Sequence, residues 1–190
     1  MLILPHPTSF FSYTCFIVLL VAGWYSYNDY YEANGVPASV YFRDVNFTDP
    51  DVRSQMESYT EQIAAMKYSG ADQPSNFWLK DFNKFVETKG IESMSFEEQI
   101  QEFLADPVNY DLYGQDMVFN EDGIMTASRT LVRLDNVDPE DVIMSVDVLE
   151  TQRAISASQP INKGLDDWKF FTFSEDYYIC KIFDLFCRAL

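Results

Sequence analysis

The stretch DMVFNEDGIMTASRTLVRLD, residues 116–135, decides the fold. It contains two runs of residues that favour extended backbone, one on each side of the dipeptide Asp122-Gly123. Asp-Gly between two such runs is the strongest short-range signal of a β-hairpin. The sequence therefore predicts two antiparallel strands, at residues 116–119 and 124–134. In the second strand two sets of residues alternate, so one of its faces is expected to be more buried than the other.

The region that precedes this hairpin begins with a further strand. Residues 39–47, SVYFRDVNF, are rich in β-branched and aromatic side chains and are typical of a strand. A helix is expected directly after it, with Thr48 or Asp49 as its N-cap and Pro50 at its first position. Apolar residues then recur at helical spacing and predict the core-facing stripe of that helix: Val52, Met56, Tyr59, Ile63 and Met66.

Two more helices are expected before the hairpin, at residues 75–88 and 95–105. Ser95 and Glu98 form the capping-box pattern that opens the second of them. The first contains the densest aromatic group of this region: Phe77, Trp78, Phe82 and Phe85. Such rings belong either to a buried core or to a surface that contacts a lipid or a partner. We expect residues 70–112 to form a helical insertion.

A helix and a strand follow the hairpin. Asp138 is the expected N-cap with Pro139 at the first helical position, and the helix should run to about Ile155. Its expected inner stripe is Val142, Val146 and Leu149. Residues 168–173 read as a final strand. With the insertion set aside, the order strand, helix, strand, strand, helix, strand predicts an α+β fold of the ferredoxin-like, split βαβ type.

The amino end predicts a membrane anchor. Residues 1–28 contain no Asp, Glu, Lys or Arg, and residues 10–27, FFSYTCFIVLLVAGWYSY, are long enough for one transmembrane helix or signal anchor. The alternative is a cleaved signal peptide with an exit near Val21-Ala22-Gly23. The first charges after this run are Asp29 and Glu32, whereas positive residues mark cytoplasmic loops. The domain at residues 29–176 is therefore expected to be extracellular or lumenal.

Two further features fit a membrane protein. Residues 177–190 have one apolar and one charged face, so they are typical of an amphipathic helix on the bilayer or of the start of another membrane span. Asn46-Phe47-Thr48 is an N-x-T sequon, which permits glycosylation of Asn46 on the lumenal side.

The composition of the chain argues against several classes of function. Lys plus Arg number 13 and Asp plus Glu number 30, a net charge of 13 − 30 = −17 that repels nucleic acid. His6 is the one histidine, and the cysteines are Cys15, Cys180 and Cys187. These residues form neither a nucleophile-histidine group nor the spacing of a zinc site. The sequence also contains no glycine-rich motif of the kind that binds phosphate. We therefore expect the chain to have no enzymatic activity and to bind no metal or cofactor. We also expect Arg129 to pair with a carboxylate.

Three segments carry a resemblance to a known family: GVPASVYF at residues 35–42, WLKDF at 78–82 and IMTASR at 124–129. In this order, and over roughly residues 24–180, the chain resembles the second large extracytosolic domain of the Patched and Niemann-Pick type C family. That family consists of sterol-sensing transporters of the resistance-nodulation-division type.

The resemblance implies a role. The domain would be non-catalytic, tethered to the lipid bilayer, and packed against a sister ectodomain to help form a path for sterols or other lipids. The sterol-sensing helices and intramembrane acidic residues of the family are missing from this sequence, which predicts a fragment or truncated product. The alternative is a free-standing single-pass or secreted binding module.

Overall fold

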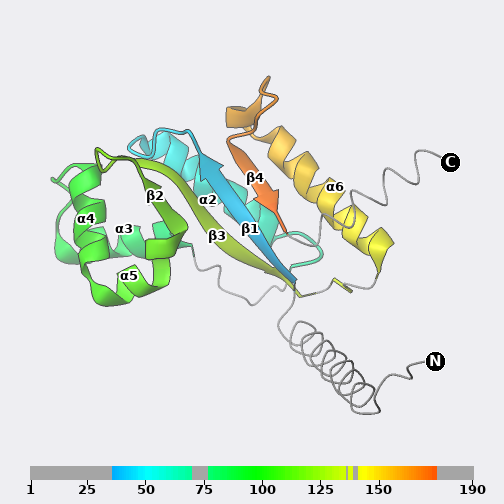
Figure 1. Ribbon diagram of the computed structural model, residues 1–190, viewed down its shortest axis with the longest axis horizontal. Helices are drawn as coiled ribbons and strands as arrows, with labels where there is room; N and C mark the ends of the chain where they lie inside the picture. The colour runs from blue at the N-terminus through cyan, green and yellow to red at the C-terminus, as the bar shows by residue number, and fades with distance from the viewer. Residues whose placement is uncertain (1–35, 70–76, 136, 139–140, 175–190) are drawn as a thin grey trace, which may run out of the picture.

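A computed structural model of the chain describes residues 36–69, 77–135, 137–138 and 141–174 (Figure 1). Its strands are β1 (Val36–Arg43), β2 (Met117–Phe119), β3 (Met125–Leu134) and β4 (Phe170–Phe173). Its α-helices are α2 (Pro50–Ala64), α3 (Trp78–Lys89), α4 (Phe96–Ala105), α5 (Pro107–Tyr113) and α6 (Val142–Ser158). Two short 3-10 helices, Gly114–Asp116 and Pro160–Asn162, precede β2 and follow α6. The expected α+β class is confirmed.

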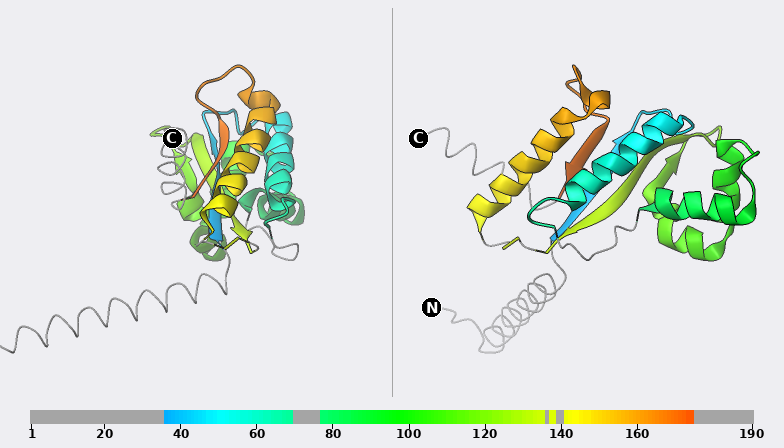
Figure 2. Two further views of the ribbon diagram at one scale, coloured as in Figure 1. Left: turned by 90° about the vertical axis from the view of Figure 1, so that its right-hand side faces the viewer. Right: turned by 180° about the vertical axis from the view of Figure 1, so that it is seen from behind.

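The four strands form one antiparallel sheet in the order β2-β3-β1-β4. Helices α2 and α6 lie side by side on one face of this sheet, as the view from behind shows (Figure 2). Helices α3, α4 and α5 gather beyond the edge formed by β2 (Figure 1). No described helix lies over the centre of the opposite face, which we call the outer sheet face.

The core lies between the sheet and its two covering helices. Strand β1 alternates strictly, so that Ala38, Val40 and Phe42 are completely buried and face α2 and α6. The expected stripe of α2 is confirmed at its centre, because Met56, Tyr59 and Ile63 are also completely buried. The stripe extends at both ends, since Val52 is half-buried against the core and Met66 is buried just after the helix.

The strand expected at residues 39–47 is placed differently in the structure. β1 begins at Val36 and ends at Arg43, because Asp44 adopts a left-handed backbone with φ of 53° and breaks the extended run. The helix that follows agrees with the prediction. Asp49 is its N-cap and accepts a hydrogen bond from the backbone N–H of Asp51 at 2.9 Å, and Pro50 occupies the first turn.

The start of α6 was predicted three residues too early. Asp141, not Asp138, is the N-cap, because its carboxylate accepts the backbone N–H of Met144 at 3.0 Å. The helix also runs further than expected, to Ser158.

The inner stripe expected for α6 was also wrong in part. Of the three predicted residues only Leu149 is buried, whereas Val142 and Val146 are half-buried. The buried side instead carries Val148, Gln152 and Ser156. The last two are held there by hydrogen bonds: Thr172 Oγ1 donates to Gln152 Oε1 at 2.9 Å, and the Ser156 and Tyr59 hydroxyls lie 2.6 Å apart.

The insertion contains three helices, one more than expected. Its capping box is confirmed, since Ser95 and Glu98 exchange side-chain and backbone hydrogen bonds at the start of α4. The additional helix α5 has a local signal that was missed: Asp106 accepts the N–H of Val108 at 2.9 Å, and Pro107 stands at the first helical position.

Both expected membrane segments, residues 1–28 and 177–190, lie outside the described residues. Among the described helices, none is long and apolar enough to cross a bilayer.

Candidate functional site: the outer sheet face

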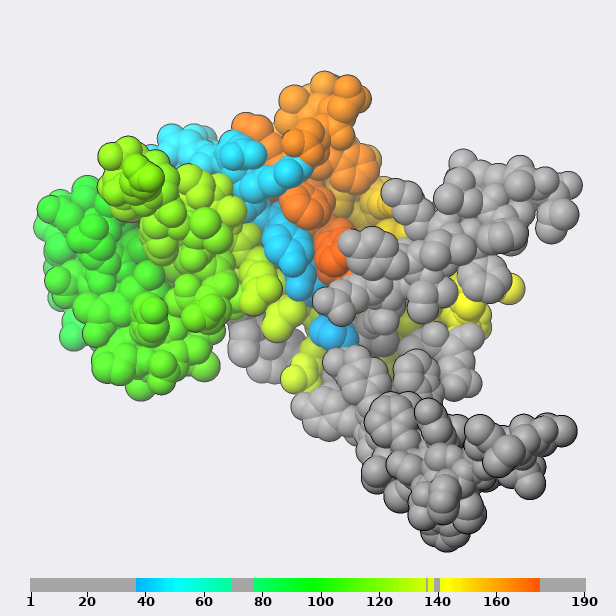
Figure 3. Space-filling model, viewed as in Figure 1, coloured from blue at the N-terminus to red at the C-terminus, as the bar shows by residue number. Residues whose placement is uncertain are grey.

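The outer sheet face is built by the residues of each strand that alternate with the buried ones. Strand pairing places them in rows: Tyr41 of β1 stands opposite Arg129 of β3 and opposite Phe171 of β4. The face comprises Pro37, Ser39, Tyr41, Arg43, Val118, Ala127, Arg129, Leu131, Arg133, Phe171 and Phe173. Figure 3 views this side, with side chains of β1, β3 and β4 reaching the surface between the insertion and α6.

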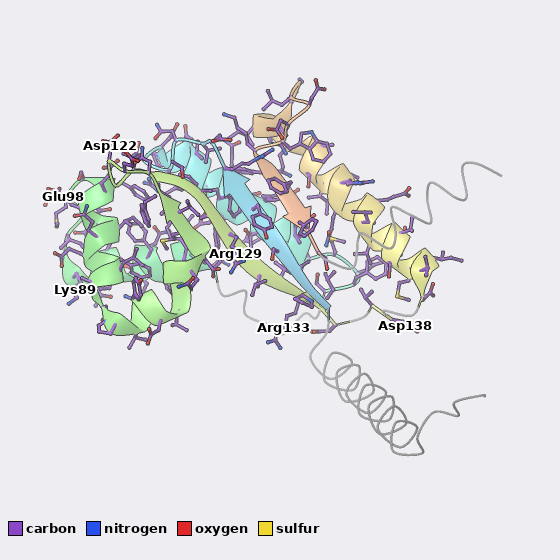
Figure 4. All side chains as sticks on the ribbon, in the orientation of Figure 1. Lys89, Glu98, Asp122, Arg129, Arg133 and Asp138 are labelled. Atoms are coloured by element: carbon purple, nitrogen blue, oxygen red, sulfur yellow. The ribbon has the colours of Figure 1, made fainter. Side chains whose placement is uncertain are left out.

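The charged side chains that the strands contribute to this face are all basic. The four strands contain three arginines and no acidic residue. All three, Arg43, Arg129 and Arg133, belong to the outer sheet face. Arg129 lies over the middle of the sheet and Arg133 near the lower end of β3 in Figure 4. Arg43 and Arg129 are each paired with a carboxylate, so Arg133 is the one of these three arginines that has no ion pair with a described residue.

The aromatic centre of the face is held by several contacts. The rings of Tyr41 and Phe171 stack with centroids 5.2 Å apart and an interplanar angle of 11°. The guanidinium of Arg43 lies 5.0 Å from the centroid of Phe171, which is cation–π distance. Arg43 also donates a hydrogen bond to the carbonyl of Trp168 at 3.2 Å and pairs with Asp167. The stack and the cation–π contact thus join Tyr41, Phe171 and Arg43 in one group on this face.

Arg129 is paired with an acidic residue, as predicted. Its Nε lies 2.6 Å from Oδ1 of Asp116, whose side chain is only 16% exposed. The hydrogen bond to Asp116 raises the pKa of Arg129, so its charge is permanent at any physiological pH. Arg133, in contrast, is exposed and forms no ion pair with the residues that the structure describes.

Apolar side chains extend the face toward the insertion. Leu131 on β3 is 45% exposed and Val118 on the edge strand β2 is 55% exposed. Three large apolar side chains of the short helix α5 are also exposed, but their spacing of two residues does not place all three on one helix face: Val108, Tyr110 and Leu112. Exposed apolar side chains such as Leu131 and Val118 are typical of a contact surface.

The aromatic group predicted to contact lipid or a partner lies mainly inside the protein. Phe77, Trp78 and Phe82 are at most 2% exposed, and Phe85 is half-buried. Their edges contact one another and Phe103, with centroids 5.4–6.1 Å apart. They tie α3 to α4 and to the main core. Contact of these rings with a lipid or a partner stays a prediction.

The predicted glycosylation residue Asn46 is exposed, in the loop between β1 and α2. This loop lies beyond the end of β1 and does not belong to the outer sheet face.

The histidine and the cysteines of the sequence cannot be placed in the structure. His6, Cys15, Cys180 and Cys187 all lie outside the described residues. Among the described residues, no group of three or more histidine, cysteine, aspartate or glutamate side chains could hold a metal ion. The buried phenol of Tyr59 keeps its proton near neutral pH, because burial raises its pKa to about 12.

No protein-family model matches this chain, and no curated protein matches it. The outer sheet face is the candidate site among the described residues.

The alternation along residues 124–134 was recognised from the sequence, but its two faces were not assigned to the core and to the surface. The available signal was the placement of Arg129, Leu131 and Arg133 on one side of that alternation.

Proposed function

We propose that this chain is a non-catalytic extracytosolic domain of a Patched-like transporter of sterols or other lipids. In this proposal a membrane helix at residues 1–28 tethers a ferredoxin-like domain on the extracellular or lumenal side. The outer sheet face packs against a sister ectodomain, and the lipid path runs along their interface.

The sheet face that no described helix covers is the observation that carries this proposal. The strand order β2-β3-β1-β4, with helices on one side, supports the ferredoxin-like fold. Such a two-layer fold leaves one side of its sheet free to bind, and this side presents tyrosine, phenylalanine and arginine. These residue types are enriched in protein interfaces, and a stacked ring loses little conformational freedom on binding.

The size of the face suits a domain contact within one assembly. Four strands spaced about 4.8 Å apart and a longest strand of ten residues at about 3.3 Å per residue give at most about 600 Å². That is the lower end of interdomain interfaces, which bury about 600–1,500 Å². A contact of this size holds best when a shared membrane tether raises the local concentration of the partner.

The experiment tests location and lipid contact together. The three native cysteines are replaced by serine, and Ile143→Cys is introduced on α6, where the side chain is 83% exposed. We expect a membrane-impermeant maleimide to label this cysteine in intact cells. A photoactivatable sterol should crosslink to the same chain in native membranes. Labelling of Ile143→Cys only after permeabilisation would contradict the location, and a sterol probe that never reaches the chain would contradict the lipid path.

A further inference from the structure

The loop between β1 and α2 presents one side chain in a state suited to covalent modification. Asn46 is exposed, and its Oδ1 accepts hydrogen bonds from Thr48 Oγ1 at 2.7 Å and from Thr48 N at 3.2 Å. Its amide nitrogen Nδ2 forms no hydrogen bond with a described residue. Because Oδ1 is engaged and Nδ2 is free, the nitrogen is the open position of this side chain.

The residues around Asn46 hold the loop independently of that side chain. Phe47 is 2% exposed and inserts into the core. Arg53 Nη1 donates hydrogen bonds to the carbonyls of Phe47 and Thr48, both at 2.8 Å, and the Arg53 guanidinium lies 5.0 Å from the ring centroid of Phe96. Burial in this position lowers the pKa of Arg53. A bulky group on Asn46 Nδ2 therefore displaces none of these contacts.

The position of the loop leaves room for a large substituent. β1 is eight residues long, so its two ends are about 26 Å apart. Asn46 follows the end of β1, whereas residue 36, which joins the preceding segment, lies at its start. In the proposed topology Asn46 therefore lies at the end of β1 that is distant from the membrane anchor. It follows Arg43 in the chain and does not belong to the central row of Tyr41 on the outer sheet face.

We propose that Asn46 carries an N-linked glycan. This inference rests on the extracytosolic location in the proposed function. In the transfer step Nδ2 forms a bond to the anomeric carbon of an oligosaccharide carried on a lipid diphosphate. The bond from that carbon to the phosphate oxygen breaks, the lipid diphosphate leaves with its electron pair, and Nδ2 loses a proton to a base of the transferase. The glycan covers the β1–α2 end of the domain and leaves the outer sheet face bare.

A gel-mobility experiment on the full chain tests this inference in cells with a secretory pathway. Asn46 lies in the sequon Asn46-Phe47-Thr48, and no other N-x-S/T sequon occurs in the sequence. We expect one endoglycosidase-sensitive shift in the wild type. Asn46→Gln and Thr48→Ala should abolish the shift, whereas Thr48→Ser should retain it, because serine keeps the hydroxyl.

A second acceptor separates this inference from the topology. Asn120 lies in the exposed hairpin turn, and Asp122→Thr creates the sequon N-E-T there. This change is made in the Asn46→Gln chain. If the new acceptor is glycosylated and wild-type Asn46 is not, the inference is overturned and the lumenal location stands. If neither acceptor is glycosylated, the proposed location and the inference both fail.

Discussion

The two faces of the sheet are made by alternate residues of the same strands, yet they have opposite properties. On the inner face Val40, Phe42 and Thr130 are completely buried against α2 and α6. On the outer sheet face Leu131 and Arg133 are exposed. Burial of apolar surface is the main source of folding free energy, so the inner face supplies stability. No described helix covers the outer face, which is the surface proposed for recognition, and the two faces can be changed separately by mutation.

Phe42→Ala should give the largest effect. The ring of Phe42 contacts those of Tyr59, Phe77 and Phe170, with centroids 4.9–6.1 Å apart, so its removal leaves a cavity at the centre of the core. We expect a loss of about 3–5 kcal/mol in the free energy of unfolding, measured by urea denaturation. Its neighbour Tyr41→Ala, on the outer face, is the control and should cost less than half as much. Equal losses would remove the distinction between the faces.

Tyr59→Phe tests the polar part of the inner face. Loss of the hydrogen bond between Tyr59 and Ser156 should cost about 1 kcal/mol at pH 7. Burial raises the pKa of Tyr59 from 10.0 to about 12, so the folded state keeps the phenol proton that the unfolded chain releases near pH 10. The stability contributed by this group is complete below pH 10 and is lost as the pH rises to about 12.

The pH dependence of unfolding measures this contribution. The wild type should lose more stability between pH 9 and pH 11.5 than Tyr59→Phe does. Ser156→Ala is the matched control, because it removes the same hydrogen bond but keeps the phenol, and it should retain a steep alkaline slope. An identical slope in the wild type and in Tyr59→Phe would show that Tyr59 is not buried as described.

Asp116→Asn probes the ion pair of the outer sheet face. The pair with Arg129 is partly exposed, so its loss should cost about 0.5–1 kcal/mol in stability at low salt and less at high salt. Asp122→Asn is a suitable control, because Asp122 is exposed and forms no ion pair with the described residues. Thermal unfolding of both variants at two salt concentrations is the measurement. A salt-independent loss would mean that the carboxylate of Asp116 acts mainly through packing.

Leu131→Ser should have the smallest effect on folding. Leu131 is 45% exposed, and substitutions at such positions change stability by about 0.5 kcal/mol or less. The proposed contact with a sister domain should nevertheless weaken, and this is read as faster protease digestion of the chain in native membranes. A loss of several kcal/mol in the isolated chain would instead assign Leu131 to the core.

Local signals in the sequence predicted much of the fold. Asp122-Gly123 predicted the hairpin because a tight turn depends on little beyond its own backbone. Gly123 indeed has a φ of 76°, in a three-residue loop that is closed by the hydrogen bond from the backbone N–H of Asn120 to the carbonyl of Ile124. The caps at Asp49 and Ser95 were found for the same reason. The start of α6 was misplaced because Asp138 and Asp141 both suit an N-cap, and the choice depends on where the helix packs.

The candidate functional surface was harder to predict because it depends on tertiary packing. Alternation along β3 shows that two faces exist, but only the positions of α2 and α6 show which one is covered. The same limit applies to the aromatic group around Trp78. Its spacing fits either a core or a contact surface, and the structure buries it because α4 packs over α3.

The most direct test of the account compares one cysteine on each side of the domain. Leu131→Cys on the outer sheet face and Ile143→Cys on α6 are made in the cysteine-free full chain, since both side chains are well exposed. Maleimide labelling rates are measured in native membranes and after purification in detergent. The account predicts that Leu131→Cys is protected in membranes and reactive when purified, whereas Ile143→Cys reacts in both. Equal and rapid labelling of both cysteines in native membranes would contradict it.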